Sequence, residues 1–229
     1  MFKKLFGGLG RGPTPPPLSQ MRYPATSPAN AVYNLLFCDD LEPFRPKSLD
    51  GAADWQVALF GPEDAAKVAA LANDTAAESR VRALAFAWLR AHNIATPKGI
   101  VLGFVLEVAL DQGLDVLAAY ADGSVRYINR TGKMTLIEPG ASAEAAAYAR
   151  RLLAISQPVV DQLGPWDQPR RPPPAPPNVR LNFVVSDGLY FGEGPFDFMQ
   201  QDGRAGPLIQ EASQLLTYIV EAAESGRAS

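Results

Sequence analysis

Few side chains in this sequence could carry covalent chemistry. The chain has one histidine, His92, and one cysteine, Cys38. Nucleophilic catalysis needs a hydroxyl or thiol beside a base, which is usually histidine. His92 follows an apolar helical stripe, where partial burial or the helix dipole explains it, and a free cysteine is typically a small buried hydrophobe. We expect both residues to be structural, and the sequence leans away from an enzyme.

Carboxylates offer a second route to chemistry. The run "CDDLEPF" places Asp39, Asp40 and Glu42 close together, and such oxygen ligands suit Mg²⁺ or Ca²⁺. The spacing does not match an EF-hand loop, so we interpret the run as a solvated acidic turn. We predict no metal site and no cofactor.

The segment "SDGLYFGEGPFDF", residues 186–198, combines acids, glycines and aromatics. Asp187, Tyr190 and Glu193 cluster around glycines that permit close backbone approach, so they could line a carboxylate-based ligand pocket. The interpretation that we favour is a tight hairpin. It sends Leu189 and Phe191 into the core, while Phe196 and Phe198 cover the terminal helix.

A second hairpin, "AAYADGSVRYINRTGKM", spans residues 118–134. Asp122-Gly123 is a strong turn signal. Arg126, Asn129 and Arg130 place polar groups on or beside the ribbon, as either a binding edge or a solvated face would. Both interpretations fit the residues.

The connector at residues 165–177 contains "RPPPAPP", which begins at Arg171. Its R-x-x-P-x-x-P spacing matches ligands of aromatic-lined grooves, because a polyproline helix has three residues per turn. We favour the alternative of a stiff connector that crosses the surface.

Composition excludes several classes of protein. A net charge of −3 and a pI near 5.3 argue against a broad nucleic-acid surface, which needs clustered Lys and Arg. The start, "MFKKLFGGLGRGP", is too short and too glycine-rich to be a signal peptide or a membrane span. A single cysteine favours a reducing compartment. We therefore expect a cytoplasmic protein.

The first part of the chain is predicted to be mainly helical. Residues 1–26 form an apolar extension and a proline-rich tether, and a helix follows Ser27-Pro28 to Phe37. The alternation of Trp55, Val57 and Leu59 predicts a short strand. A helix should run from Pro62 to Leu71, and a capping box at 75–78 should start the next one.

The rest of the chain predicts an antiparallel sheet with amphipathic helices packed to one side. Residues 99–164 should form a four-strand meander and a helix that kinks or breaks just before Pro158, and residues 178–225 a later hairpin and a terminal helix. The fold class is therefore α+β, with a single domain over residues 27–225, of which 27–95 are mainly helical.

The stretch "GLDVLAAYADGSVRYIN", residues 113–129, resembles a segment of uncharacterised bacterial proteins that have no assigned activity. The resemblance covers mainly the meander and implies a reused bacterial domain. It brings no catalytic residue, cofactor or partner.

These observations favour a non-enzymatic protein-interaction or regulatory module whose partner is another protein. A homo-oligomer assembled through sheet edges stays open. The alternative is an enzyme, or a protein that binds a small ligand or metal through carboxylates near the 186–198 hairpin.

Overall fold

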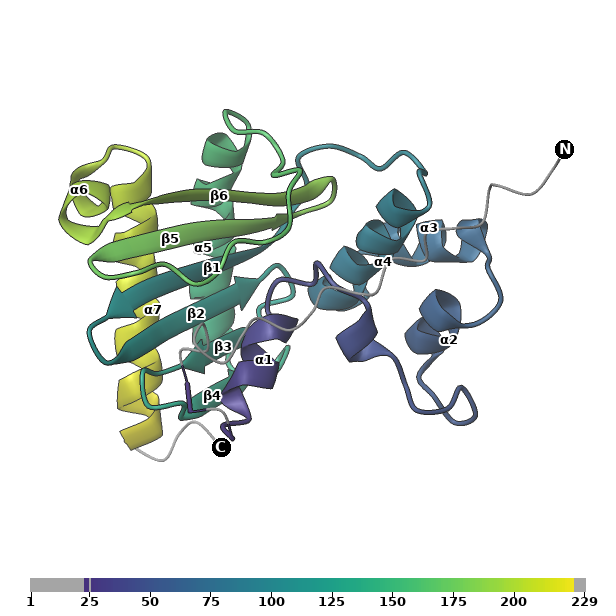
Figure 1. Cartoon of the computed structure of the whole chain (residues 1–229), viewed down its shortest axis with the longest axis horizontal. Helices are drawn as coiled ribbons and strands as arrows, with labels where there is room; N and C mark the ends of the chain where they lie inside the picture. Colours follow the sequence, from purple (N-terminus) through teal and green to yellow (C-terminus); the bar gives the residue numbers. More distant parts are fainter. Residues whose placement is uncertain (1–22, 25, 225–229) are drawn as a thin grey trace, which may run out of the picture.

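The computed structural model describes residues 23, 24 and 26–224, and its centre is a six-stranded antiparallel sheet (Figure 1). Its strands lie in the order β4-β3-β2-β1-β5-β6. Their bounds are β1 Val101–Leu110, β2 Gly113–Tyr120, β3 Val125–Ile128, β4 Met134–Ile137, β5 Asn178–Val185 and β6 Gly188–Pro195. The predicted meander and later hairpin are confirmed, and they join where β5 pairs with β1.

The central strand β1 is covered on both faces, as its nearly continuous apolar run predicts. Successive side chains of a strand point to opposite faces. Phe104 and Leu106 belong to one apolar cluster, and Val105 belongs to the other. Glu107, one residue after Leu106, is completely buried.

One face of the sheet packs on long helices and is dry. Helices α5 (Ala143–Val160) and α7 (Ala205–Glu224) run behind the sheet in Figure 1, and the short α6 (Phe196–Gln201) precedes α7. The β5 residues Val179, Leu181, Phe183 and Val185 all point into this cluster, as their alternation predicts. We call it the dry face.

The other face of the sheet is covered by segments that are far apart in the chain. Helix α1 (Ala29–Leu35), the loop after it and residues 165–177 lie in front of the sheet in Figure 1. We call residues 165–177 the strap. The prediction that helices pack to one side only is therefore wrong, because α1 also covers sheet residues such as Glu107, to which Tyr33 is hydrogen-bonded.

A group of helices lies beyond the ends of the strands (Figure 1). It comprises α2 (Asp54–Phe60), α3 (Ala65–Asn73) and α4 (Ser79–Ala91), and the one-turn 3₁₀ helix η2 (Glu42–Phe44) precedes it. Ser79 and Asp122 exchange two hydrogen bonds, of 2.7 and 2.8 Å, between backbone amides and side-chain oxygens. The turn between β2 and β3 therefore holds the start of α4.

Two predictions in this region are wrong. Trp55, Val57 and Leu59 lie in helix α2, because three alternating residues in so short a segment also fit a helix that buries Ala58 and Leu59. Helix α4 begins at Ser79 rather than at the predicted capping box, since the amide of Ser79 bonds to Asp122. The predicted helix before it is confirmed as α3, which Asp64 caps.

We expected a kink or a break just before Pro158, and the structure shows no break there. Helix α5 continues to Val160, so the proline lies within its last turn. Near the end of a helix, the hydrogen bond that proline removes belongs to only one turn. Helix α6 was not predicted, and its Phe198 is 68% exposed rather than packed on the terminal helix.

The predicted N-terminal extension lies outside the described residues, as does most of the tether. Within the described part of the chain, no helix is both long enough and apolar enough to cross a membrane.

Candidate functional site

The polar residues of the hairpin at residues 118–134 form hydrogen bonds within the fold. Arg126 is 3% exposed and donates to the carbonyls of Val125 and Ile137 and to Glu138. The side chain of Asn129 accepts bonds within its own turn, and the backbone amide of Arg130 donates to Asp115 at 2.6 Å. The geometry therefore explains Arg126 and Asn129 as supports of β3 and β4, while the side chain of Arg130 stays exposed.

The candidate residues of the hairpin at residues 186–198 divide between the two faces of the sheet. The Tyr190 hydroxyl donates to Asp187 at 2.9 Å, and partial burial and this carboxylate raise the pKa of Tyr190 to about 12. Asp187 also accepts from the amide of Gly99. Tyr190 packs into the dry face, whereas Glu193 bonds to Arg180 on the strap side. The structure brings Asp187 and Tyr190 together but not Glu193.

His92 and Cys38 have the structural surroundings expected of them. The ring of His92 stacks on Trp88 at 3.7 Å, and its Nδ1 lies 2.8 Å from the Trp88 carbonyl oxygen. Cys38 is 2% exposed, and burial raises the pKa of its thiol to about 12. A thiol with so high a pKa is a poor nucleophile at neutral pH.

The acidic turn after α1 serves several contacts. Asp40 accepts from the amide of Glu42, and Glu42 pairs with Arg45 at 2.6 Å. Asp39 accepts a bond of 2.8 Å from Arg170 of the strap. In the part of the chain that the structure describes, no group of three His, Cys, Asp or Glu residues is placed to hold a metal ion.

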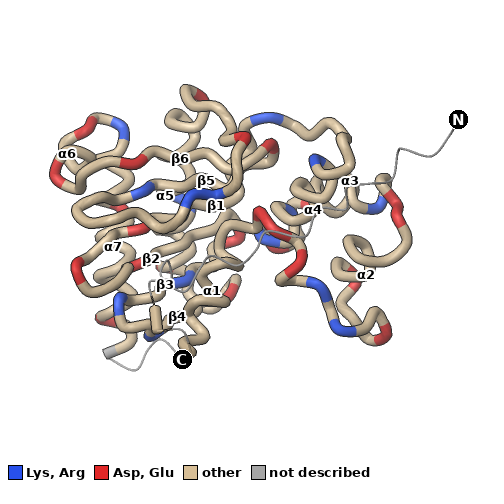
Figure 2. Tube along the Cα trace, viewed as in Figure 1, with Lys and Arg blue, Asp and Glu red and all other residues tan. Residues whose placement is uncertain are grey.

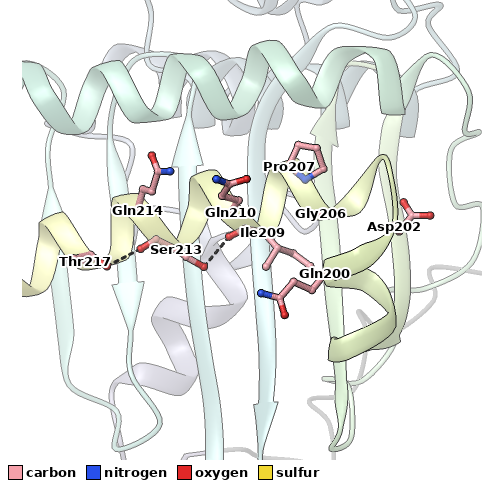
Figure 3. A pocket seen from close by; sticks show the side chains of 9 residues that line it. All are labelled: Gln200, Asp202, Gly206, Pro207, Ile209, Gln210, Ser213, Gln214 and Thr217. Atoms are coloured by element: carbon pink, nitrogen blue, oxygen red, sulfur yellow. Dashed lines mark hydrogen bonds between the residues drawn. The ribbon is translucent and has the colours of Figure 1, made fainter.

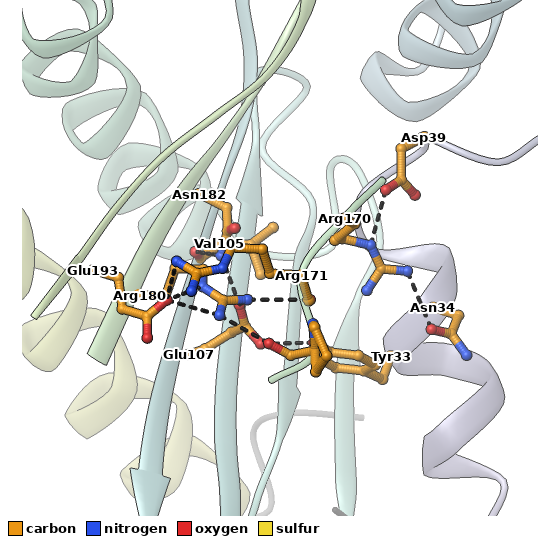
Figure 4. A network of polar contacts seen from close by, with 11 residues as sticks. Tyr33, Asn34, Asp39, Val105, Glu107, Arg170, Arg171, Arg180, Asn182 and Glu193 are labelled. Atoms are coloured by element: carbon orange, nitrogen blue, oxygen red, sulfur yellow. Dashed lines mark hydrogen bonds and ion pairs between the residues drawn. The ribbon is translucent and has the colours of Figure 1, made fainter. Parts of the chain in front are cut away.

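Glu107 is the centre of a buried polar network that the sequence did not reveal (Figure 4). Its carboxylate accepts from the Tyr33 hydroxyl at 2.6 Å and from the Asn182 amide at 2.9 Å. Arg180 lies 3.5 Å away. Burial raises the pKa of Glu107, although Arg180 and the two donors act in the opposite direction. The contacts join α1, β1 and β5.

Arg180 connects this network to the strap and to β6. Its guanidinium donates to Glu193 at 2.8 and 2.9 Å, and to the carbonyl oxygens of Arg171 and Pro172 at 3.3 and 2.8 Å. Its side chain is only 3% exposed. Unpaired charge is costly to bury, so these acceptors account for the presence of a guanidinium at this depth.

The two arginines of the strap bind to segments that are far apart in the chain. Arg170 donates to Asp39 and, at 3.2 Å, to Asn34, and its guanidinium lies 4.1 Å from the ring centre of Phe37. Arg171 lies 3.6 Å from Glu193 and 5.9 Å from the ring of Phe191. We define the strap platform as the surface that receives the strap. Its residues are Tyr33, Asn34, Phe37, Asp39, Arg180, Phe191 and Glu193.

A separate groove of about 530 Å³ lies on the outer side of α7, next to α6 (Figure 3). Most of its polar lining is uncharged, and the residues are Gln200, Asp202, Gly206, Pro207, Ile209, Gln210, Ser213, Gln214 and Thr217. Hydrogen bonds between the residues drawn run from Ser213 to Ile209 and from Thr217 to Ser213. The three glutamine amides make no bond to one another or to the other lining residues.

The one carboxylate among the lining residues of this groove, Asp202, already accepts hydrogen bonds from the protein backbone. Asp202 accepts from the amides of Arg204 and Ala205 at the start of α7, and these bonds lower its pKa. What the groove offers is therefore amide and hydroxyl hydrogen bonding beside the apolar Pro207 and Ile209. Figure 2 shows charges of both signs spread along the chain, and a short basic stretch of the strap crosses the front of the sheet.

Comparisons with models of protein families, with curated proteins and with solved structures found no match to this chain. The functional argument therefore depends on the geometry of the strap platform and of the groove. One signal in the sequence could have indicated the buried network: Glu107 is the only charged residue in the apolar run 99–110, although its partners cannot be read from that run. The groove gave no signal, because exposed glutamines are ordinary on a helix.

Proposed function

We propose that the protein is a protein-interaction module that binds a polypeptide segment in the groove beside α6 and α7. The observation that carries this proposal is the groove itself, which combines three glutamine amides with the apolar residues Pro207 and Ile209 beside α6 and α7. Each glutamine side chain can donate and accept, as a peptide group also does. An extended segment is therefore the chemistry that this lining matches best.

The surroundings of the groove support a protein partner. Phe198 on α6 is 68% exposed, and aromatic residues are enriched among those that dominate binding energy at interfaces. Because the groove has little charge available, it selects a segment that is uncharged where it makes contact. Nucleic acid, whose binding depends on neutralising phosphates, does not fit this lining.

The alternative of a carboxylate pocket in the 186–198 hairpin is disfavoured by geometry. Glu193 points to the opposite face of the sheet from Tyr190, and Arg180 already occupies its carboxylate. We also propose that the protein is cytoplasmic, because it has a single cysteine. We propose a bacterial origin because residues 113–129 resemble a segment of bacterial proteins.

Photo-crosslinking tests the groove in the full chain. A photoreactive residue at Gln210 should form an adduct with a partner in lysate, and the same residue at the exposed Lys47 should not. With the partner purified, Gln210→Ala/Gln214→Ala should weaken binding about tenfold, since two hydrogen bonds contribute about 1.4 kcal/mol together. Gln201→Ala, which lies on the neighbouring helix α6 but outside the groove, is the control. Equal affinities for the three proteins would refute the proposal.

A further inference from the structure

The strap is bound as a peptide ligand would be, although it belongs to the same chain. Extended proline-rich segments are recognised through their carbonyl oxygens and through side chains that contact aromatic rings. Here Arg180 donates to two consecutive strap carbonyls, those of Arg171 and Pro172. Pro174, the first proline of the R-x-x-P-x-x-P pattern, is buried. The segment whose spacing matches ligands of aromatic-lined grooves is thus bound to its own fold.

The strap platform provides two positions for arginine. At the first, Asp39 and Asn34 accept from the guanidinium of Arg170 while the ring of Phe37 lies 4.1 Å from it. At the second, Glu193 and Phe191 face Arg171. An acceptor combined with an aromatic face suits the planar guanidinium better than the compact ammonium of lysine. Charge and shape therefore both specify arginine at these positions.

The two positions differ in how accessible they are. The Arg170 side chain is 18% exposed, whereas that of Arg171 is 52% exposed. Arg180, whose guanidinium donates to the strap carbonyls, is held in place by Glu107 and Glu193, which do not belong to the strap. The position of Arg180 is therefore fixed by carboxylates of the sheet as well as by the strap that it binds.

We infer that the strap platform is a recognition surface for extended segments with two arginines followed by prolines, and that residues 170–174 occupy it in competition with such a segment of a partner protein. This inference concerns a different surface from the groove and does not depend on it. A tethered segment competes at an effective concentration in the millimolar range. The apparent affinity for a partner is reduced by the fraction of molecules in which the platform is open.

Peptide binding tests this inference on the full chain. The probe is a labelled synthetic peptide, Arg-Arg-Pro-Pro-Pro-Ala-Pro-Pro, and the control peptide has alanine in place of both arginines. Arg170→Ala/Arg171→Ala removes the anchors of the strap and keeps the platform intact. Anisotropy should show the arginine peptide binding to this variant at least about tenfold more tightly than to the wild type, because the competitor is weakened. The control peptide should bind to neither.

Two further variants make the test specific. Asp39→Asn/Glu193→Gln, added to the opened variant, should abolish binding of the arginine peptide, because it removes the negative charge that faces each guanidinium. Gln210→Ala/Gln214→Ala, in the groove, should leave peptide binding unchanged, which separates this inference from the proposed function. If near-UV circular dichroism shows that the opened variant is unfolded, Arg170→Lys/Arg171→Lys replaces it, since lysine keeps the charge and loses the planar contact. Absence of binding to a folded opened variant at 1 mM peptide, or equal binding of the two peptides, would overturn the inference.

Discussion

The two faces of the sheet are sealed in different ways. On the dry face, residues such as Phe183 and Leu208 pack between β5 and the long helices, and the contact is almost wholly apolar. On the strap side, apolar packing is joined by a buried carboxylate and by arginines that link segments far apart in the chain. Apolar packing tolerates many arrangements, whereas charged pairs need defined partners. The strap side is therefore where the fold places its specific contacts.

The largest expected effect is on the dry face. Phe183→Ala should lower the free energy of unfolding by about 4 kcal/mol, because it removes a fully buried ring and leaves a cavity. Urea unfolding followed by circular dichroism measures the change. The loss should be the same at pH 5 and pH 8, since none of the groups removed titrates. A loss that depends strongly on pH would show that this face is not simply apolar.

Arg180→Leu should cost about 3 kcal/mol at neutral pH, because it leaves Glu107 buried without its nearest cation. Burial already raises the pKa of Glu107, and losing the guanidinium raises it further. When the pKa of a carboxyl is higher in the folded than in the unfolded state, the free energy of unfolding falls as the pH rises from the unfolded pKa to the folded pKa. The deficit should therefore shrink as the pH is lowered, unlike that of Phe183→Ala. Urea titrations of the variant and the wild type across this pH range measure it, and a deficit that grows on acidification would contradict this account.

A smaller effect is expected from the first arginine of the strap. Arg170→Ala should cost about 1–2 kcal/mol, since its pair with Asp39 is partly buried and its guanidinium lies over Phe37. Arg151→Ala is the matched control on the dry side, where an exposed arginine pairs with Glu211 at 2.6 Å. It should cost no more than about 0.5 kcal/mol. Equal losses in thermal or urea unfolding would remove the distinction between the two sides.

Alkylation of Cys38 should report on access to the loop that the strap covers. Its thiol pKa of about 12 leaves roughly one molecule in 10⁴ as thiolate at pH 8. Iodoacetamide should react with the native protein far more slowly than with the unfolded chain. The rate should rise in Arg170→Ala, because Cys38 lies between Phe37 and Asp39, which hold that arginine. An unchanged rate would mean that the strap does not control access to this loop.

The sequence predicted those parts of the fold that depend on local patterns. Alternation in β5 and the Asp122-Gly123 turn are local signals, and both strand pairs formed as expected. Helix α2 was missed because three alternating residues fit two structures, and only packing decides between them. The burial of Glu107 and Arg180 was missed for a different reason. Their partners, such as Tyr33, come from distant segments, and no local pattern identifies them.

The candidate sites show the same limit. Glu193 was selected for its neighbours in sequence, Asp187 and Tyr190, yet its partner in space is Arg180. In a strand, residues separated by an odd number of positions lie on opposite faces, and Tyr190 and Glu193 are three apart. That rule alone could have separated them. The groove beside α7 depends on how α6 turns against it, which the sequence does not specify locally.

Arg170 and Arg171 are consecutive in the chain, yet one bonds to Asp39, 131 residues away, while the other faces Glu193. Inserting or deleting one residue between Trp166 and Arg170 would move both arginines along the platform. Arg170 would then no longer lie beside Asp39, or Arg171 beside Glu193. Surface connections usually vary freely in length among related proteins. In the strap, the number of residues determines whether the two arginines reach Asp39 and Glu193. Differences in length among related proteins should therefore be concentrated in other loops.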